Sequence, residues 1–382
     1  MTRFRSIDTL RGIVMILMAL DHVRDFFGVP GISPTNLAQT SVPLFLTRWV
    51  THICAPTFFL LTGTGAFLAL ARKSVPDLSR FLFVRGLWLI VLELTVVRCL
   101  GLQFNVDYQV TMLLVIWALG WAMIVLSALV WLPLPAILAF ALVTIAGHNL
   151  LDGVRSAHPL WAILHSPGFV VNRPGLVVFA SYPLIPWIGV TAAGYVLGPI
   201  YRWSAPRRRT FLLWGGLGLV AAFAVLRAIN VYGDPAPWAP QASAALTMVS
   251  FLNVTKYPPS LLFLLMALGP ALLVLRALDA ATPRVLAPAL VFGRVPLFYF
   301  LLHLPLIHGL AVALCYLLNG GVHWMFESPN LGAYPFTPPP VWGLSLPVIY
   351  LIWIAVVAVM YPACAWFASV KQQRQNAWLS YL

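Results

Sequence analysis

The stretch that decides the fold is residues 5–27, RSIDTLRGIVMILMALDHVRDFF. It is long enough to cross a membrane as a helix, for which about 20 mostly apolar residues are needed. After Arg5 at its start, its charged and titratable side chains are Asp8, Arg11, Asp21, His22, Arg24 and Asp25. Because such groups are costly in lipid, they normally face a bundle interior or a wet cavity. We therefore expect a first spanning helix with a polar inner face.

The composition of the whole chain favours the same class. Hydrophobic residues make up 61% of the 382 residues and charged residues 9%, and the mean hydropathy is +0.90. Soluble domains have roughly 45–50% apolar and about 25% charged residues. We expect an all-α, polytopic integral membrane protein, in which about ten transmembrane helices form one bundle. Residues 1–382 are expected to be a single domain.

The expected helices follow from the apolar runs. They are 7–27, 44–71, 81–102, 109–131, 134–150, 177–200, 211–230, 258–277, 295–318 and 342–368. Residues 151–176 also suit an amphipathic or re-entrant segment.

The distribution of Lys and Arg predicts the orientation. Alternate loops carry most of these residues, and cytoplasmic loops are the ones enriched in them. We expect the bacterial inner membrane, with both termini cytoplasmic and the lipid bilayer as the first partner. The loops 151–176, 231–257 and 319–341 then lie outside, where they form either a lid or substrate-facing surface or ordinary connections. The net charge of +13 is explained by this bias, so no nucleic-acid partner is expected.

Other sites are not indicated. Cys54, Cys99, Cys315 and Cys364 lie in apolar runs without CxxC spacing, which is typical of small buried hydrophobes. The motifs of metalloproteases, P-loop nucleotidases and α/β-hydrolases are absent from the sequence. We expect no metal site.

One face of the first helix carries the strongest signal. Arg11 and His22 are eleven residues apart, which places them about 20° apart around a helix and roughly 16 Å apart along it. Asp8 can pair with Arg11 at i,i+3, and Asp21 or Asp25 can orient His22. We expect the guanidinium and the imidazole to face one interior channel. Snorkelling of Arg11 to lipid headgroups is the alternative.

The second helix adds a further pair of polar residues. Arg48 and His52 are at i and i+4 and should share a face near the outer mouth. Gly63 and Gly65 should allow close helix contact in the inner half.

Two later helices carry isolated ionisable groups. Glu93 needs a partner, which Arg11, His52 or His303 could supply, and it suits either a structural ion pair or a relay. Arg294 and His303 are nine residues apart, or ~14 Å along a helix. They repeat the pattern of an inner Arg and a mid-membrane His.

Three blocks carry a resemblance to a known family. They are residues 5–27, quoted above, RWVTHICAPTFFLLTGTGAFL at 48–68 and GRVPLFYFLLHLPLIH at 293–308. The chain resembles the bacterial heparan-α-glucosaminide N-acetyltransferase catalytic-domain family, within a superfamily of transmembrane acyltransferases. It is also similar to bacterial membrane O-acyltransferases of surface polysaccharides, whose first helix carries Arg, ten residues, then His. Arg11 and His22 reproduce that spacing.

The resemblance implies a function and roles for these residues. An acyl group, in the simplest case acetyl, would pass from cytoplasmic acetyl-CoA or another acyl-CoA to an extracytoplasmic acceptor, such as a cell-envelope glycan or amino sugar. Arg11 and Arg294 would bind the donor. His22, oriented by Asp21 or Asp25, would deprotonate the acceptor or take the acyl group itself. The remaining polar groups, Arg48, Glu93 and His303, would line the substrate-binding site.

The sequence leaves some alternatives open. In the eukaryotic heparan enzymes the position of His22 is not His, and the catalytic His lies ahead of the second helix, where residues 28–47 contain none. His52 is therefore the second choice for the catalytic imidazole. A proton-coupled transporter or exporter is the main functional alternative, since buried His, Glu and Arg also form proton relays. A non-catalytic scaffold is the third alternative. The oligomeric state is open, with a homodimer among the alternatives.

Overall fold

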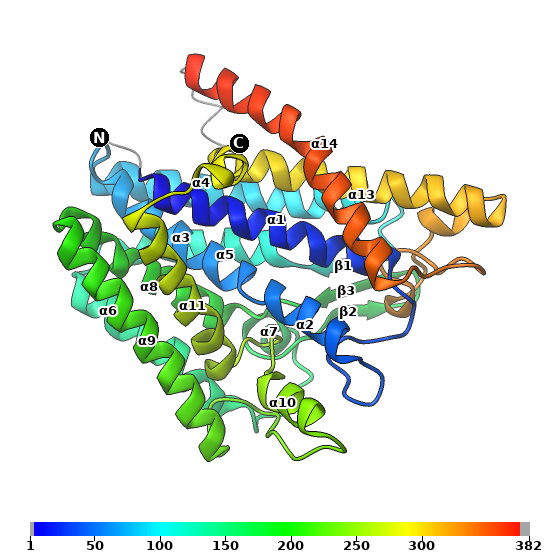
Figure 1. Cartoon of the computed structure of the whole chain (residues 1–382), viewed down its shortest axis with the longest axis horizontal. Coiled ribbons are helices and arrows are strands. Elements are labelled where there is room, and N and C mark those ends of the chain that lie inside the picture. The colour runs from blue at the N-terminus through cyan, green and yellow to red at the C-terminus, as the bar shows by residue number, and fades with distance from the viewer. Residues whose placement is uncertain (1–3, 375–382) are drawn as a thin grey trace.

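The structure, a computed structural model, describes residues 4–374 and is mainly helical (Figure 1). The chain ends at 1–3 and 375–382 lie outside that range, so the cytoplasmic location of both termini stays a prediction. The α-helices in chain order are α1 (Arg5–Phe27), α2 (Val42–Thr51), α3 (Cys54–Ala69), α4 (Val75–Leu92), α5 (Val115–Leu129), α6 (Leu134–Gly147), α7 (Pro159–Leu164), α8 (Leu184–Leu197), α9 (Ala205–Ile229), α10 (Ala244–Leu252), α11 (Leu261–Ala280), α12 (Ala287–Arg294), α13 (Pro296–Asn319) and α14 (Leu346–Gln373).

Shorter helical elements extend or connect these helices. A π-helix, η1 (Glu93–Leu102), continues α4. The 3₁₀ turns are η2 (His148–Leu151), η3 (Gly198–Arg202), η4 (Arg284–Leu286), η5 (His323–Phe326) and η6 (Leu331–Ala333).

The expected polytopic all-α membrane fold is confirmed. Among the described residues, seven helices are long and apolar enough to cross a membrane by length and composition. Three other expected spans also contain helices: α1, α4 with its π-helical continuation, and α5, which has only 15 residues. The helix α1 has the required length but carries several charges, as its sequence indicated.

The second expected span is divided. α2 ends at Thr51 and α3 begins at Cys54, with His52 and Ile53 between them. Pro56 lies in the first turn of α3. A proline has no N–H to donate and its ring clashes with the carbonyl four residues earlier, here that of His52. The break therefore follows from the sequence, and it gives His52 a position at a helix end.

A small sheet was not predicted. Its strands are β1 (Val110–Leu113), β2 (Gly168–Arg173) and β3 (Leu176–Ala180), in the order β1-β3-β2. β1 pairs with β3 in parallel, and β2 pairs with β3 antiparallel as a hairpin. The predicted spans 109–131 and 177–200 were therefore too long at their first residues. The segment 151–176, expected to be amphipathic or re-entrant, forms α7 and β2.

Glycines bring helices into backbone contact. A Cβ atom added to Gly12 of α1 would lie 1.7 Å from the Ala289 carbonyl oxygen, and one added to Gly293 of α12 would lie 1.7 Å from that of Asp8. Such distances are impossible for real atoms, so only glycine allows α1 and α12 to pack this closely. Arg11 directly precedes Gly12, and Arg294 directly follows Gly293. The contact therefore places both arginines at the same helix crossing.

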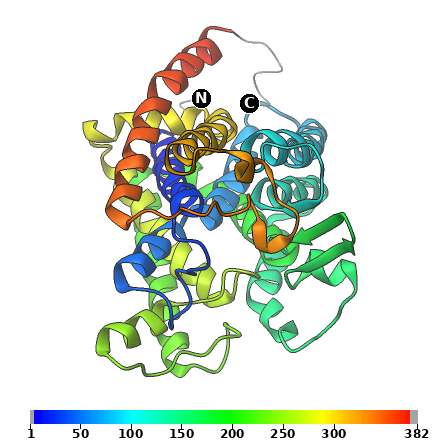
Figure 2. The ribbon, with the colours of Figure 1, turned by 90° about the vertical axis from the view of Figure 1, so that its right-hand side faces the viewer.

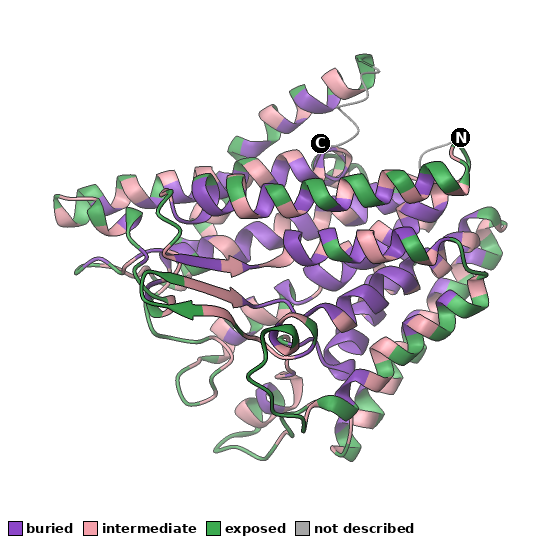
Figure 3. Cartoon of the chain, turned by 180° about the vertical axis from the view of Figure 1, so that it is seen from behind, coloured by how far each residue is buried: buried purple, intermediate pink, exposed green. Residues whose placement is uncertain are grey.

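The first helix lies inside the bundle. α1 packs against α3, α11, α12, α13 and α14, and Figure 2 shows it enclosed by elements from distant parts of the chain. The peripheral helices α6, α9 and α14 are only 22% buried over their apolar windows. Figure 3 shows the exposed residues along such outer helices. Because these exposed faces are apolar, they are suited to contact with lipid.

Candidate active site

The inner face of α1 borders a cavity of about 340 Å³. The residues of α1 that line it are Arg11, Met15, Met18, Asp21 and His22. They include Arg11 and His22, which the sequence placed on one face, and they come from most of the length of the helix. Arg11 and His22 therefore face one shared cavity, as the spacing predicted. A volume of this size is in the range of small-molecule pockets, roughly 300–1,000 Å³.

Arg11 is fixed at one end of this cavity. Its Nη1 donates to Oδ1 of Asp8 at 3.1 Å and to the carbonyl oxygen of Gly293 at 3.2 Å. The predicted pairing of Asp8 with Arg11 is confirmed. Arg294 also lines the cavity, and its buried Nε has no hydrogen-bond partner in the described part of the chain. An anion at this end would meet two guanidinium groups, and that of Arg11 is already held in place.

Two further cations line the cavity, Arg85 of α4 and Lys371 of α14. The first turn of α14 lies near the far end of α1, since the N–H of Leu344 donates to the Phe27 carbonyl at 2.8 Å. Lys371, in the last turn of this 28-residue helix, therefore lies toward the Arg11 end. We name Arg11, Arg85, Arg294 and Lys371 the cationic end of the cavity.

At the other end the imidazole of His22 meets a second imidazole. Nδ1 of His22 lies 2.7 Å from Nε2 of His303 in α13, and the two rings are nearly parallel with centroids 5.0 Å apart. His303 is fully buried. Its Nδ1 lies 2.8 Å from the carbonyl oxygen of Phe300 and 3.0 Å from that of Tyr299.

These contacts determine which nitrogen carries each proton. A carbonyl oxygen can only accept, so Nδ1 of His303 must donate to it. A fully buried imidazole is more stable without a charge, so Nε2 of His303 accepts the proton of His22 Nδ1. The remaining nitrogen of His22, Nε2, then has a free lone pair. His22 lines the cavity, so this arrangement prepares it to act as a base.

The carboxylates predicted to orient His22 contact other residues. Asp21 forms an ion pair with Arg48, another with Arg24 at 2.8 Å, and accepts a hydrogen bond from Thr51 Oγ1 at 3.0 Å. Asp25 pairs with Arg24 at 2.5 Å. The prediction that Asp21 or Asp25 orients His22 was therefore wrong, because neighbouring arginines occupy both carboxylates. The residue that contacts Nδ1 of His22 is His303.

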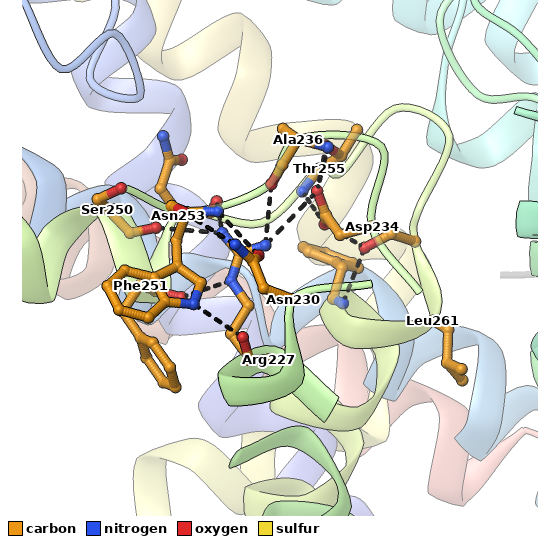
Figure 4. A network of polar contacts seen from close by, with 12 residues as sticks. Arg227, Asn230, Asp234, Ala236, Ser250, Phe251, Asn253, Thr255 and Leu261 are labelled. Carbon is orange, nitrogen blue, oxygen red and sulfur yellow. Dashed lines mark hydrogen bonds and ion pairs between the residues drawn. The ribbon is translucent and has the colours of Figure 1, made fainter. Parts of the chain in front are cut away.

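Lys256 reaches the cavity from the loop 231–257, which was predicted to lie outside. Figure 4 shows the polar network that holds this loop. Arg227, at the end of α9, is 1% exposed and donates to the carbonyls of Phe251, Ala236, Ser250 and Asn253. Asp234 accepts from the N–H of Thr255 at 2.8 Å and from Ser260 Oγ at 2.6 Å. The loop therefore has a defined conformation on both sides of Lys256.

Two tyrosines border the same region. Tyr182 lines the cavity, and its hydroxyl lies 3.4 Å from that of Tyr257. Burial raises the pKa of the Tyr257 phenol, but the nearby cations Lys256 and Arg48 outweigh burial, so its pKa lies below the ordinary value. We name His22, Thr51, Tyr182 and Lys256 the histidine end of the cavity. It combines an imidazole base, hydroxyl groups and one ammonium group.

Comparison with known families agrees with this geometry. A family model described as heparan-α-glucosaminide N-acetyltransferase, catalytic, matches residues 3–230. The chain belongs to this family. It is therefore a transmembrane acetyltransferase. A search of curated proteins finds no match.

Glu93 of the acetyltransferase has a different partner from the three proposed for it. Its Oε2 accepts hydrogen bonds from the backbone N–H groups of Ile116 at 3.0 Å and Trp117 at 3.2 Å. These groups belong to the first turn of α5, whose free N–H donors and partial positive charge favour a carboxylate. Glu93 thus acts as a helix cap between η1 and α5. The expected pairing with Arg11, His52 or His303 was wrong.

His52 of the acetyltransferase does not line the cavity with His22. It packs edge-on against Phe263 of α11, with ring centroids 5.3 Å apart, and its buried Nδ1 has no partner among the described residues. Arg48, expected to share a face with it, turns to Asp21 instead. Arg48 and His52 therefore point in different directions, because α2 ends at Thr51, between them.

Sequence reasoning missed part of the acetyltransferase site. Neither Arg85 nor Lys371 was predicted to line the cavity, and Thr51 and Tyr182 carry no motif. A second cavity of about 400 Å³ lies beside Arg24 and Asp25. Tyr334, Phe336 and Trp342 line it, so the loop 319–341 contributes to a concave surface there.

Proposed function

We propose that this transmembrane acetyltransferase takes an acetyl group from cytoplasmic acetyl-CoA and passes it to an extracytoplasmic acceptor through the α1 cavity. The supporting observation is that Arg11 and His22 line the same cavity. The proposed membrane is the bacterial inner membrane, with both termini in the cytoplasm. The donor then approaches from the cationic end, and the acceptor approaches from the histidine end.

The cationic end suits the phosphates of coenzyme A. Guanidinium groups bind phosphate through paired, charge-assisted hydrogen bonds, and a lysine adds a point charge. Arg11 is already held by Asp8 and the Gly293 carbonyl, so little ordering is needed when it binds. Arg294, with its unpartnered Nε, is the second proposed phosphate ligand, and Arg85 and Lys371 add charge. The pantetheine arm would extend along Met15 and Met18 toward His22.

The histidine end suits the acceptor chemistry. The Nε2 lone pair of His22 would take the proton of an acceptor amine or hydroxyl as that group attacks the thioester carbonyl. The new C–N or C–O bond forms, the C–S bond breaks, and the proton passes from His22 to the departing thiolate. His303 is then a positioning residue. In the alternative mechanism, His22 first takes the acetyl group from the thioester, and the acceptor then attacks the acetyl-His22 intermediate.

The proposed acceptor is a cell-envelope glycan or amino sugar. Thr51, Tyr182 and Lys256 offer hydroxyl and ammonium groups around His22, and hydroxyl-rich ligands use such partners. The outer loop that carries Lys256 is held by Arg227 and Asp234, so this side of the site is preorganised. No metal is part of the proposed reaction.

A proteoliposome assay tests the proposal. Purified protein is reconstituted with a unique orientation, and radiolabelled acetyl-CoA, which does not cross the bilayer, is supplied on one face and glucosamine on the other. We expect labelled sugar only when acetyl-CoA is on the face of the cationic end. Proton-driven uptake of a small molecule without acetyl transfer would instead support the transporter alternative. Radiolabel that stays covalently bound to His22 when no acceptor is present would show that transfer passes through an acetyl-His22 intermediate.

A further inference from the structure

A second cluster of chemically active side chains lies outside the cavity. His148 and Asp152 flank the 3₁₀ turn η2 after α6, and His165 follows α7. One ligating atom from each of the three lies within 4.8 Å of the others. Nε2 of His165 is 3.6 Å from Oδ1 of Asp152. Seventeen residues separate the two histidines, so their proximity is a product of the fold.

His148 is the member that lacks a partner. It is 2% exposed, and neither of its ring nitrogens makes a hydrogen bond in the described part of the chain. The Pro259 carbonyl lies beside the ring but outside hydrogen-bonding geometry. A buried polar group without a partner is destabilising and therefore calls for an explanation. A bound ion would give one of these two nitrogens a partner.

The other two members are oriented by neighbouring groups. Oδ2 of Asp152 accepts from Asn149 Nδ2 at 2.8 Å, which leaves Oδ1 toward His165. Nδ1 of His165 lies 3.2 Å from Ser166 Oγ. Hydrogen bonds of this kind behind a ligand are a regular feature of metal sites, because they fix its tautomer and direction.

We propose that His148, Asp152 and His165 bind one zinc ion. Two imidazoles and one carboxylate favour zinc over magnesium or calcium, which prefer oxygen ligands. Zinc holds such ligands at about 2.0–2.2 Å in a tetrahedron, which separates them by roughly 3.4 Å. The Asp152–His165 distance of 3.6 Å already matches. The His148 ligand atom lies within 4.8 Å of the other two and would have to move inward to complete the set. Water takes the fourth position.

Zinc binding at His165 requires a change of tautomer without a net gain or loss of protons. In the structure Nε2 of His165 donates to the His148 carbonyl at 2.8 Å. When zinc occupies Nε2, the proton resides on Nδ1, where it donates to Ser166 Oγ. The His148 carbonyl oxygen, which lies 2.8 Å from Nε2 of His165, must move aside to admit the ion. Because ligation needs neutral imidazoles, binding weakens as the histidines are protonated at low pH.

The role of this site is structural. None of the three residues lines the catalytic cavity. Asn149, which holds Asp152, also accepts the N–H of Leu261 at 2.9 Å at the start of α11, and Pro259 lies beside His148. An ion here therefore joins the end of α6 to α7 and to the segment that follows Lys256.

Zinc binding can be measured directly. The protein is purified with a peptide tag that contains no histidine, stripped with a chelator, and dialysed against zinc. Elemental analysis should give one zinc per chain, and zinc should raise the melting temperature of the stripped protein. The variants His148→Ala and His165→Ala should lose this zinc and the melting-temperature increase, whereas His158→Ala, at an exposed histidine of the same segment, should keep both.

Two outcomes would overturn the assignment. One is wild-type protein that retains no stoichiometric zinc after dialysis. The other is His148→Ala or His165→Ala protein that binds as much zinc as the wild type. Melting of each variant without zinc, compared with the stripped wild type, shows whether it is folded. If an alanine variant does not fold, Asp152→Asn replaces it, because this change removes a ligand charge and keeps the shape.

Discussion

Nδ1 of His22 and Nε2 of His303 lie 2.7 Å apart, although 281 residues separate them. Because His303 donates its own Nδ1 proton to a backbone carbonyl, it can only accept from His22. The helix α13 thus fixes the tautomer of a residue on α1. This relationship replaces the carboxylate–imidazole pair that the first helix alone suggested.

Two replacements of His303 should distinguish its hydrogen bond to His22 from its role in filling space. His303→Gln can place an amide oxygen near the position of Nε2 and so accept from His22, whereas His303→Leu fills the space without an acceptor. We expect the leucine variant to lose about a hundredfold in kcat, the lower range for general base catalysis. The KM for acetyl-CoA should be unchanged. The glutamine variant should recover much of the rate, and equal rates for both variants would contradict the tautomer argument.

Asp21 and Asp25 should differ in their effect on stability. Asp21→Asn leaves the buried guanidinium groups of Arg24 and Arg48 without their shared carboxylate, a loss that typically costs about 3–5 kcal/mol. The side chain of Asp25 is 51% exposed. Asp25→Asn should therefore lower the free energy of unfolding by at most about 1 kcal/mol. Thermal melting in detergent measures both. Asp25→Asn protein with greatly reduced acetyl transfer would restore the view that this carboxylate orients His22.

Glu93 should contribute to stability and not to the chemical step. Glu93→Ala removes the acceptor for two backbone N–H groups of α5, and we expect a loss of about 1–2 kcal/mol. Glu93→Gln keeps an amide oxygen there and should lose less. Melting temperatures and kcat measured on the same preparations test this. A Glu93→Gln enzyme that is fully stable but inactive would assign Glu93 a role in proton transfer.

Gly63 and Gly65 form a matched pair. A Cβ atom at Gly63 would lie 1.9 Å from the Thr191 carbonyl oxygen of α8, whereas nothing lies within 4 Å of one at Gly65. Gly63→Ala should therefore force α3 and α8 apart and lower the melting temperature by several degrees, as overpacking costs typically about 1–3 kcal/mol. Gly65→Ala should leave it unchanged. Comparable melting temperatures for the two variants would contradict the described α3–α8 contact.

Much of the fold was predictable because lipid imposes a simple rule on sequence. Every spanning helix needs a long apolar run, and each of the expected runs contains a helix. The strands β1 and β3 were not predictable, because an apolar run of four or five residues has the same composition in a buried strand as in a buried helix. Gly63 was correctly expected at a close helix contact, whereas Gly65 borders the cavity.

The candidate site was predictable only within one helix. The periodicity of α1 placed Arg11 and His22 on one face, and it placed Asp8 beside Arg11. It could not show that Arg48, from α2, would approach Asp21, or that His303 would approach His22. Glu93 was expected to pair with a cationic side chain, but it accepts hydrogen bonds from backbone N–H groups at the N-terminus of α5. Contacts between distant segments depend on helix packing, which a single sequence does not encode visibly.

The central claim is that Arg11 and His22 act at opposite ends of one cavity. It is tested most directly by measuring coenzyme A affinity and the acetyl transfer rate for His22→Ala and Arg11→Ala, with His323→Ala as the matched control. We predict that His22→Ala binds coenzyme A like the wild type but transfers at least about a hundredfold more slowly, whereas Arg11→Ala loses affinity. Wild-type transfer by His22→Ala protein would contradict the account.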